Sequence, residues 1–252
     1  AVETGAKTGI FYADAVTVRH LAGHGVAASP QVVEEPRYER EIAIDLSGIV
    51  PLVAVPHRVD TVREAEDVAG TPIDQVFVGT CTNGRYEDLA RLARIVRGRK
   101  VAVRTLVVPA SRAVLARAIA TGVLADIVDA GCMVAPPGCG PCLGAHEGVM
   151  GEGEVCLSTA NRNFKNRMGV GAEIYLSSVA TAAVSALAGE IADKNIARWV
   201  EGDDRRKQAP AVLVCQRSRH PIDDRRNDRI CGAEVDAHRD SHGRNSLLGT
   251  TC

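Results

Sequence analysis

The chain has few aromatic residues and almost no net charge. Phe, Trp and Tyr make up 3% of its 252 residues, and the formal charge at pH 7 is −1. The scarcity of aromatics argues against a β-sandwich with a Tyr- and Trp-rich core, and it favours closely packed α/β layers. A nearly neutral chain has no broad basic surface to displace the counterions of phosphates, so the composition argues against nucleic-acid binding.

The sequence also lacks long apolar runs, and its opening residues do not have the pattern of a secretory leader. The sequence contains no run of about 18 apolar residues that would span a membrane. Its opening residues, AVETGAKTGIF, lack the basic and apolar regions of a signal peptide. We therefore expect a cytoplasmic protein with no membrane partner. In that compartment the eight cysteines are expected to be reduced thiols or metal ligands rather than disulfides.

Strand-like and helix-like segments alternate along the middle of the chain. QVFVG, VAVRTLVV, CMVA and EVCLST have the pattern of short buried strands, and helical periods separate them. In one helical segment Leu89, Leu92, Ala93 and Val96 mark a single face, and Ser111 is suited to cap the next helix. This order predicts an α/β fold with a mostly parallel sheet, helices on both faces, and ligands beyond the carboxyl ends of the strands.

Three regions of the chain differ in pattern. Residues 1–40 are interrupted by glycines and are interpreted as the end of a preceding domain, whereas 41–193 carry the α/β pattern. Residues 194–252 are rich in Arg and Asp without a sustained period, which predicts an irregular tail. We interpret this tail as a frame-shifted or read-through segment or a genuine extension. Because the chain opens without Met, we expect an upstream segment to precede it.

Three cysteines lie beside loop-forming residues. Cys81 follows a predicted strand in GTCTNGR, and Cys139 and Cys142 form a Cys-x-x-Cys pair in PPGCGPCLG. Asn-Gly favours a sharp turn, and the glycines let the backbone approach a bulky group. All three cysteines follow strand ends, so we expect them to converge at one edge of the sheet. Each motif alone also fits half of a zinc ribbon, a redox pair or buried thiols that pack as small hydrophobes.

The number of cysteine ligands separates two kinds of iron–sulfur protein. A 4Fe–4S cluster that only carries electrons normally has four thiolate ligands, whereas three ligands leave one iron open to a substrate hydroxyl and carboxylate. An electron-transfer protein would need Cys132 or Cys156 as a fourth ligand. Both lie in apolar strands, where packing is the favoured role.

Four motifs occur in the order VETGAKTGIF, FVGTCTNGRYEDL, PPGCGPCLG and STANRNFKNRMG. With them, residues 2–193 resemble the large subunits of the 3-isopropylmalate dehydratases, in the aconitase superfamily of iron–sulfur hydro-lyases. The resemblance implies a three-layer parallel-sheet domain of the aconitase type, preceded by part of another α/β domain. It also implies a 4Fe–4S cluster held by Cys81, Cys139 and Cys142. The implied reaction isomerises 2-isopropylmalate and 3-isopropylmalate by dehydration and rehydration, in leucine biosynthesis.

The resemblance extends to substrate-binding and catalytic residues. It implies that Arg162 and Arg167 bind carboxylates of the hydroxy acid substrate, that Asn161 hydrogen-bonds near the cluster, and that Glu3 is catalytic. The alternative role for each arginine is a purely structural ion pair with a surface carboxylate. Asn166 stands where the family usually has Gly, so a positive φ at this position would threaten the placement of Arg167.

The resemblance also implies a partner protein. In this family a small swivelling subunit supplies the catalytic serine base and further arginines, so we expect the chain to be inactive alone. Two other interpretations remain open. One is a subunit of a homoaconitase or of a dimethylmalate-type dehydratase, and the other is a non-catalytic, truncated cluster-binding remnant.

Overall fold

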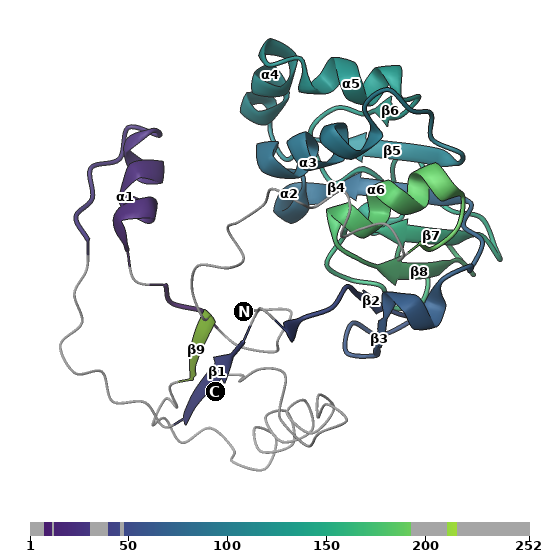
Figure 1. Ribbon diagram of the computed structural model, residues 1–252, viewed down its shortest axis with the longest axis horizontal. Helices are drawn as coiled ribbons and strands as arrows, with labels where there is room; N and C mark the ends of the chain where they lie inside the picture. The colour runs from purple at the N-terminus through teal and green to yellow at the C-terminus, as the bar shows by residue number, and fades with distance from the viewer. Residues whose placement is uncertain (1–7, 12, 31–39, 46–47, 193–210, 216–252) are drawn as a thin grey trace. The chain divides into compact units, whose positions relative to one another are not determined.

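The computed structural model describes residues 8–11, 13–30, 40–45, 48–192 and 211–215. The chain divides into two compact units (Figure 1). The first comprises Ala1–Leu46 and Ala209–Cys252, and the second comprises Ser47–Gln208. No helix in the described parts of the chain is long and apolar enough to cross a lipid bilayer.

The first unit contains one described helix and one pair of strands. Helix α1 (Ala15–Ala22) begins at Asp14, whose Oδ1 accepts a hydrogen bond from the backbone N–H of Thr17 at 2.7 Å. Strand β1 (Arg40–Ile44) pairs antiparallel with β9 (Ala211–Cys215). The sequence pattern did not reveal β9, and the rest of the predicted tail lies outside the described residues. The predicted boundaries near residues 40 and 193 stay a prediction.

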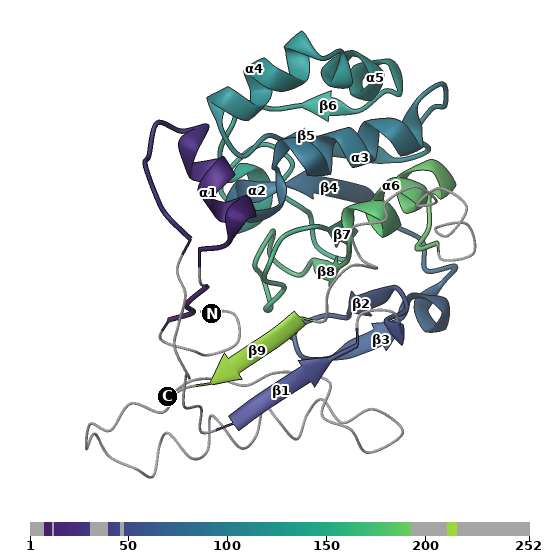
Figure 2. The ribbon, with the colours of Figure 1, turned by 60° about the vertical axis from the view of Figure 1, so that its left-hand side comes forward.

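A seven-stranded sheet forms the centre of the second unit, in the order β3-β2-β8-β7-β4-β5-β6 (Figure 2). The strands β8, β7, β4, β5 and β6 run parallel, and β2 pairs antiparallel with both β3 and β8. The predicted α/β class with a mostly parallel sheet is therefore confirmed. The strands are β2 (Leu52–Ala54), β3 (Val62–Glu64), β4 (Gln75–Gly79), β5 (Arg104–Val108), β6 (Met133–Val134), β7 (Val155–Ser158) and β8 (Glu173–Leu176).

Four helices pack against one another and against one face of this sheet. They are α3 (Tyr86–Val96), α4 (Arg112–Ala120), α5 (Val123–Asp129) and α6 (Val179–Ala188). The predicted apolar face of α3 is buried, as expected from its period. Ser111 caps α4 as predicted, because its Oγ accepts the N–H of Val114 at 3.3 Å.

The opposite face of the sheet is covered by loops rather than by long helices. Phe77, Leu106 and Val108 point to this side, where their apolar cluster includes Cys142 and Met168. The only helix contributing there within the described residues is the 3₁₀ turn η4 (Gly140–Leu143); another 3₁₀ turn, η3 (Ala65–Val68), follows β3. The prediction of helices on both faces is thus corrected. Glycine-rich connections cannot sustain a helical period, so they cover this face as irregular chain.

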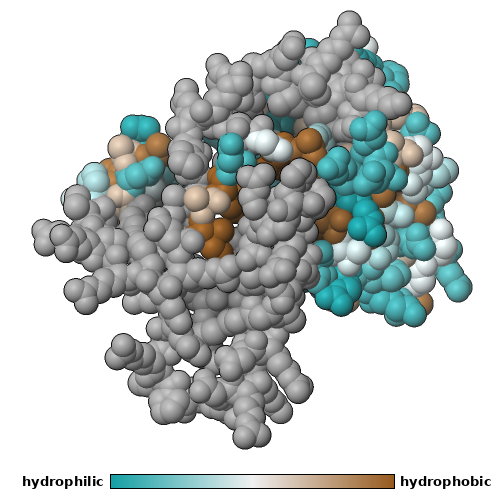
Figure 3. Space-filling view, turned by 60° about the horizontal axis from the view of Figure 1, so that its bottom comes forward, coloured by the Kyte–Doolittle hydropathy of each residue, from teal (hydrophilic) through white to brown (hydrophobic). Residues whose placement is uncertain are grey.

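At the right of the view in Figure 3, the described surface is mostly hydrophilic, and single hydrophobic residues lie between the polar ones. Scattered apolar side chains of this kind are normal on a folded domain. Phe164 and Leu143 are two of these exposed apolar side chains, and both lie in the loops described below.

Candidate functional site

Three loops leave the same edge of the parallel sheet. Residue Gly79 ends β4 opposite Val108 of β5, and Phe77 of β4 lies opposite Ser158 of β7. The carboxyl ends of these strands therefore lie together, at the edge where parallel sheets bind ligands. Cys81 follows β4 within the short helix α2 (Thr80–Asn83), and the segment from Thr159 to Arg162 follows β7. Cys139 and Cys142 belong to the loop that follows β6.

The turn that carries Cys81 presses on the end of β5. A Cβ added to Gly79 would lie 2.3 Å from the carbonyl oxygen of Val108, and one added to Gly84 would lie 2.5 Å from the same atom. The N–H of Ala110 donates to the carbonyl of Gly84 at 2.8 Å. Only glycine fits two such close approaches. As a result the backbone of this turn lies against β5. The side chain of Cys81 is exposed.

The loop that carries the Cys-x-x-Cys pair contacts the same strand end. A Cβ on Gly140 would lie 2.8 Å from Cγ2 of Val108 and 3.4 Å from the ring of Phe77. The N–H of Cys142 donates to the carbonyl of Cys139 at 3.2 Å, which closes the turn. Cys139 is exposed and Cys142 is buried. The turn of Cys81 and the loop of Cys139 and Cys142 therefore both pack on Val108, at the carboxyl end of β5.

The loop after β7 is tied to the Cys81 turn. The hydroxyl of Thr159 accepts the N–H of Gly79 at 3.0 Å, and the side-chain amide of Asn83 donates to the carbonyl of Thr159. Asn161 and Arg162 follow directly, and both are partly exposed. These two predicted substrate-binding residues therefore start from a segment that is fixed to the turn of Cys81.

Arg167 contacts a predicted cluster ligand. Its Nη2 lies 3.6 Å from Sγ of Cys142, and its guanidinium carbon lies 5.1 Å from the centre of the Phe164 ring. Its Nε is buried and has no hydrogen-bond partner. A guanidinium presents several N–H donors in one plane, so Arg167 can contact the sulfur and still offer a donor to a carboxylate.

Asn166, which departs from the family pattern, does adopt a positive φ of 65°. Asparagine tolerates this left-handed conformation better than most residues. Its side chain also accepts the N–H of Gly171 at 3.0 Å, which fixes the turn locally. Arg167 lies beside Cys142 in this arrangement, and its role toward the substrate stays a prediction.

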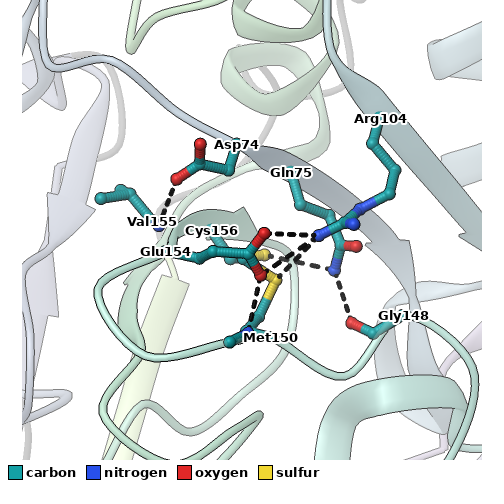
Figure 4. Close-up of polar contacts among 9 residues, drawn as sticks. Asp74, Gln75, Arg104, Gly148, Met150, Glu154, Val155 and Cys156 are labelled. Atoms are coloured by element: carbon teal, nitrogen blue, oxygen red, sulfur yellow. Dashed lines mark hydrogen bonds and ion pairs between the residues drawn. The ribbon is translucent and has the colours of Figure 1, made fainter.

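The segment that links Cys142 to β7 crosses the sheet to its opposite edge, where polar contacts hold it (Figure 4). The buried amide of Gln75 donates to the carbonyl of Gly148 at 2.9 Å, and Arg104 lies 3.4 Å from Glu154. The returning segment that carries Arg167 runs beside it, since the N–H of Met150 donates to the carbonyl of Met168 at 2.9 Å. The same contacts thus support both Cys142 and Arg167.

The two cysteines assigned to packing are buried, as predicted. Cys132 directly precedes β6, and Cys156 lies within β7 with no exposed surface. Burial raises the pKa of Cys132 to about 11 and the pKa of Cys156 to about 12. A thiol with so high a pKa resists becoming the thiolate that iron binds. Neither is therefore suited to be a fourth ligand, which weighs against the electron-transfer alternative.

The donor set fits an iron–sulfur cluster. It would consist of three thiols on two loops that both contact Val108, with a guanidinium against the sulfur of Cys142. Across the described ranges no three His, Cys, Asp or Glu side chains gather around a point suited to a single ion. The ligand roles stay a prediction, and so does the role of Glu3, which lies outside the described residues.

Sequence reasoning missed two residues of this site. Val108 is the common contact of both cysteine loops, but in the sequence it is one valine of an apolar strand. Thr80 has a positive φ of 84°, which no sequence signal indicates because a β-branched residue rarely adopts it. Both could be found only from the three-dimensional structure.

Similarity to known proteins agrees with the motifs. The model of the aconitase family (aconitate hydratase) matches residues 61–189. A probable methanogen homoaconitase large subunit from Methanosarcina mazei is 54% identical, over 77% of this chain and 50% of its own length. A 3-isopropylmalate dehydratase large subunit from Archaeoglobus fulgidus is 53% identical, over 77% of this chain and 48% of its own length.

A methanogen homoaconitase large subunit from Methanocaldococcus jannaschii is 45% identical, over 77% of this chain and 50% of its own length. The chain spans about half the length of the curated relatives it matches. The matched residues 61–189 include β4 to α6, and with them all three cysteine ligands predicted from the sequence. The chain belongs to the aconitase family.

Proposed function

We propose that the chain is the large subunit of an iron–sulfur hydro-lyase of the 3-isopropylmalate dehydratase type. The contact between Arg167 and Cys142 carries this proposal, because it places a carboxylate-binding group directly beside a predicted cluster ligand. Relatives named 3-isopropylmalate dehydratase large subunit support the same reaction class. The proposed reaction removes water from 2-isopropylmalate and adds it back at the neighbouring carbon, within leucine biosynthesis.

Cys81, Cys139 and Cys142 would hold a 4Fe–4S cluster at the carboxyl edge of the sheet. When bound, a cluster with three protein ligands supplies one open iron as a Lewis acid for the substrate hydroxyl and a carboxylate oxygen. Such thiolate ligands require a reducing compartment, which supports the cytoplasm as the proposed location.

The protein's own contribution is to bind and orient the substrate. The unpartnered Nε of Arg167 offers an N–H donor in a buried position, where a charged hydrogen bond to carboxylate is strong. Arg162 and Asn161 extend the donor set from the adjoining loop, which the bond between Thr159 and Gly79 fixes to the Cys81 turn. Binding at several donors holds the acid in one orientation for proton removal.

The proposed partner is a small subunit that supplies the proton-abstracting base and further arginines. The relatives are named large subunits, which supports such a partner. We propose a catalytic role for Glu3, and a domain division into a preceding remnant (1–40), the cluster-binding domain (41–193) and a tail (194–252). On this proposal the chain alone has no hydro-lyase activity.

A second candidate is the large subunit of a homoaconitase. Two relatives that are 54% and 45% identical to the chain carry that name, so identity does not separate the two substrates. The two enzymes share the reaction, and they differ in the side group of the hydroxy acid. A non-catalytic cluster-binding remnant is the outcome if neither substrate reacts.

The test is anaerobic reconstitution of the full chain with iron and sulfide, followed by addition of a small subunit. Dehydration of the hydroxy acid to the unsaturated intermediate is followed by the gain in ultraviolet absorbance, with 2-isopropylmalate and the hydroxy acid of homoaconitase as competing substrates. We expect turnover of one of them only when both subunits are present. A chain that loads a cluster and turns over neither acid would refute the proposed function.

A further inference from the structure

Two residues other than glycine have a positive φ within the described parts of the chain. They are Thr80, at 84°, and Asn166, at 65°. Thr80 directly precedes Cys81, a predicted cluster ligand, and Asn166 directly precedes Arg167, which contacts Cys142. Non-glycine residues in the left-handed region are uncommon, and the strain persists only where surrounding interactions maintain it. Their positions next to two site residues suggest a common purpose.

Thr80 is a costly residue to place in this conformation. It is β-branched, so its side chain crowds the backbone at positive φ, and only 1% of its surface is exposed. Its hydroxyl accepts the N–H of Thr82 at 3.3 Å and that of Asn83 at 3.4 Å, and it lies 3.0 Å from the Thr82 hydroxyl. These contacts span Cys81, so the side chain of Thr80 holds the turn on both sides of that cysteine.

The residues around Thr80 restrict the turn from outside. Gly79 and Gly84 lie against the carbonyl oxygen of Val108 so closely that no Cβ fits on either. The turn therefore has little freedom to relax the strain by moving its ends. The Thr80 hydroxyl selects one conformation of the chain between these two fixed points.

Asn166 maintains the second left-handed position in a similar way. Its Oδ1 accepts the N–H of Gly171 at 3.0 Å and closes the loop between them. Gly171 lies against Glu152, where an added Cβ would come within 2.7 Å of Cγ. Arg167 is the next residue, and its Nη2 reaches the sulfur of Cys142 from this loop.

We propose that Thr80 and Asn166 are positioning residues: their side-chain hydrogen bonds hold a left-handed backbone that directs Cys81 and Arg167 into the site. That Cys81 is placed to bind a cluster and Arg167 to bind an acid substrate rests on the proposed function. Each side chain acts through its neighbour and need not touch substrate. The hydrogen bonds of Thr80 and Asn166 themselves are present in the chain without cofactor.

Matched variants separate the hydrogen bond from the size of the side chain. Thr80→Ser keeps the hydroxyl, and Thr80→Val keeps the branched shape without it. Asn166→Asp keeps an acceptor, and Asn166→Gly keeps the backbone freedom without one. The full-length chain is compared by amide hydrogen exchange resolved by NMR, by urea unfolding, and by iron and sulfide bound after anaerobic reconstitution.

We expect Thr80→Val to accelerate exchange at the amides of Thr82 and Asn83 by about tenfold, the scale of one lost hydrogen bond. Bound iron should fall severalfold while the urea midpoint stays near that of the parent chain, and Thr80→Ser should restore both exchange and iron. Asn166→Gly should accelerate exchange at Gly171 and shift the cluster reduction potential to more negative values, because a donor at the Cys142 sulfur is no longer fixed. Asn166→Asp should keep the slow exchange.

Unchanged exchange in Thr80→Val and Asn166→Gly would overturn the proposal. Equal loss of iron in Thr80→Ser and Thr80→Val would also overturn it, because the hydroxyl would then not be responsible. A parent chain that binds no cluster would overturn the assignment of Thr80 to ligand positioning. A parent chain that binds the cluster and shows no hydro-lyase activity together with a small subunit would end the proposed function and leave this inference standing.

Discussion

Substitution of Gly140 by Ala tests whether the cysteine loop depends on its close contact with β5. The new Cβ would lie 2.8 Å from Cγ2 of Val108 and 3.4 Å from the ring of Phe77, and Gly140 has a φ of 54°. Valine is stiff about χ1 and Val108 is fully buried, so the contact has no easy relief. The change adds one methyl group and alters no charge or ligand.

The expected loss follows from two contributions. An L-residue in the left-handed region costs about 1–2 kcal/mol, and an added carbon in a well-packed site costs about 1–3 kcal/mol. Together they lower the free energy of unfolding by about 2–5 kcal/mol. Because a urea m-value for a domain of this kind is about 2 kcal/mol/M, in the middle of the usual range, the unfolding midpoint should fall by roughly 1–2.5 M.

Gly138→Ala is the matched control on the other side of Cys139. A Cβ on Gly138 meets nothing within 4 Å, and its φ lies outside the left-handed region. This variant should be neutral or more stable by about 0.4–1 kcal/mol through the unfolded state. Val108→Ala combined with Gly140→Ala removes the clashing methyl group, so the double variant should be more stable than the sum of the single effects predicts.

Urea unfolding of the chain without cofactor gives these free energies, and iron analysis after reconstitution shows whether the loop still binds. We expect Gly140→Ala to lose both stability and bound iron, and Gly138→Ala to keep both. Equal midpoints for the two variants would refute the packing argument. Strict additivity with Val108→Ala would show that the destabilisation comes from elsewhere.

Three further predictions concern the thiols and Arg167. Replacement of any of the three predicted ligands by Ala should abolish cluster loading, whereas Cys132→Ala should keep the iron content of the parent chain, as measured by iron and sulfide analysis. The pKa of the Cys156 thiol is about 12 in the folded chain, against an ordinary value of 9.0 in the unfolded chain. The free energy of unfolding should therefore fall as pH rises through this range, because only the unfolded thiol loses its proton. Urea unfolding at about pH 8 and pH 10 should show a smaller fall in the free energy of unfolding for Cys156→Ala than for the parent chain. Arg167→Lys should raise KM for the hydroxy acid by about tenfold or more because a planar donor pair is lost. Arg94→Lys, at an exposed position of α3, should leave KM unchanged.

Local patterns predicted the parallel core of the second unit well. The strand QVFVG corresponds to β4, and the face marked by Leu89 and Val96 is buried in α3. These elements are short, strongly periodic and bounded by turn formers, so propensity and packing agree. The burial of Cys132 and Cys156 followed from the same apolar context.

Contacts between distant segments could not be read from the sequence. Strands β3 and β8 were not predicted, because both are short and a single pairing such as that of Ala54 with Leu176 leaves little local signal. The meeting of two cysteine loops at Val108 depends on the order of strands in the sheet. The contact between Arg167 and Cys142 depends on a segment that crosses the sheet and returns, which no local period describes.

The crossing segments have a mechanical consequence. Gln75 and Arg104 lie at the amino edge of the sheet, yet they fasten the chain that joins a sulfur donor to its arginine neighbour. Loss of these contacts would let Cys142 and Arg167 both shift from their positions, since the hydrogen bond between Met150 and Met168 joins the two segments that carry them. Damage far from the reacting atoms would then resemble a defect of the cofactor pocket itself.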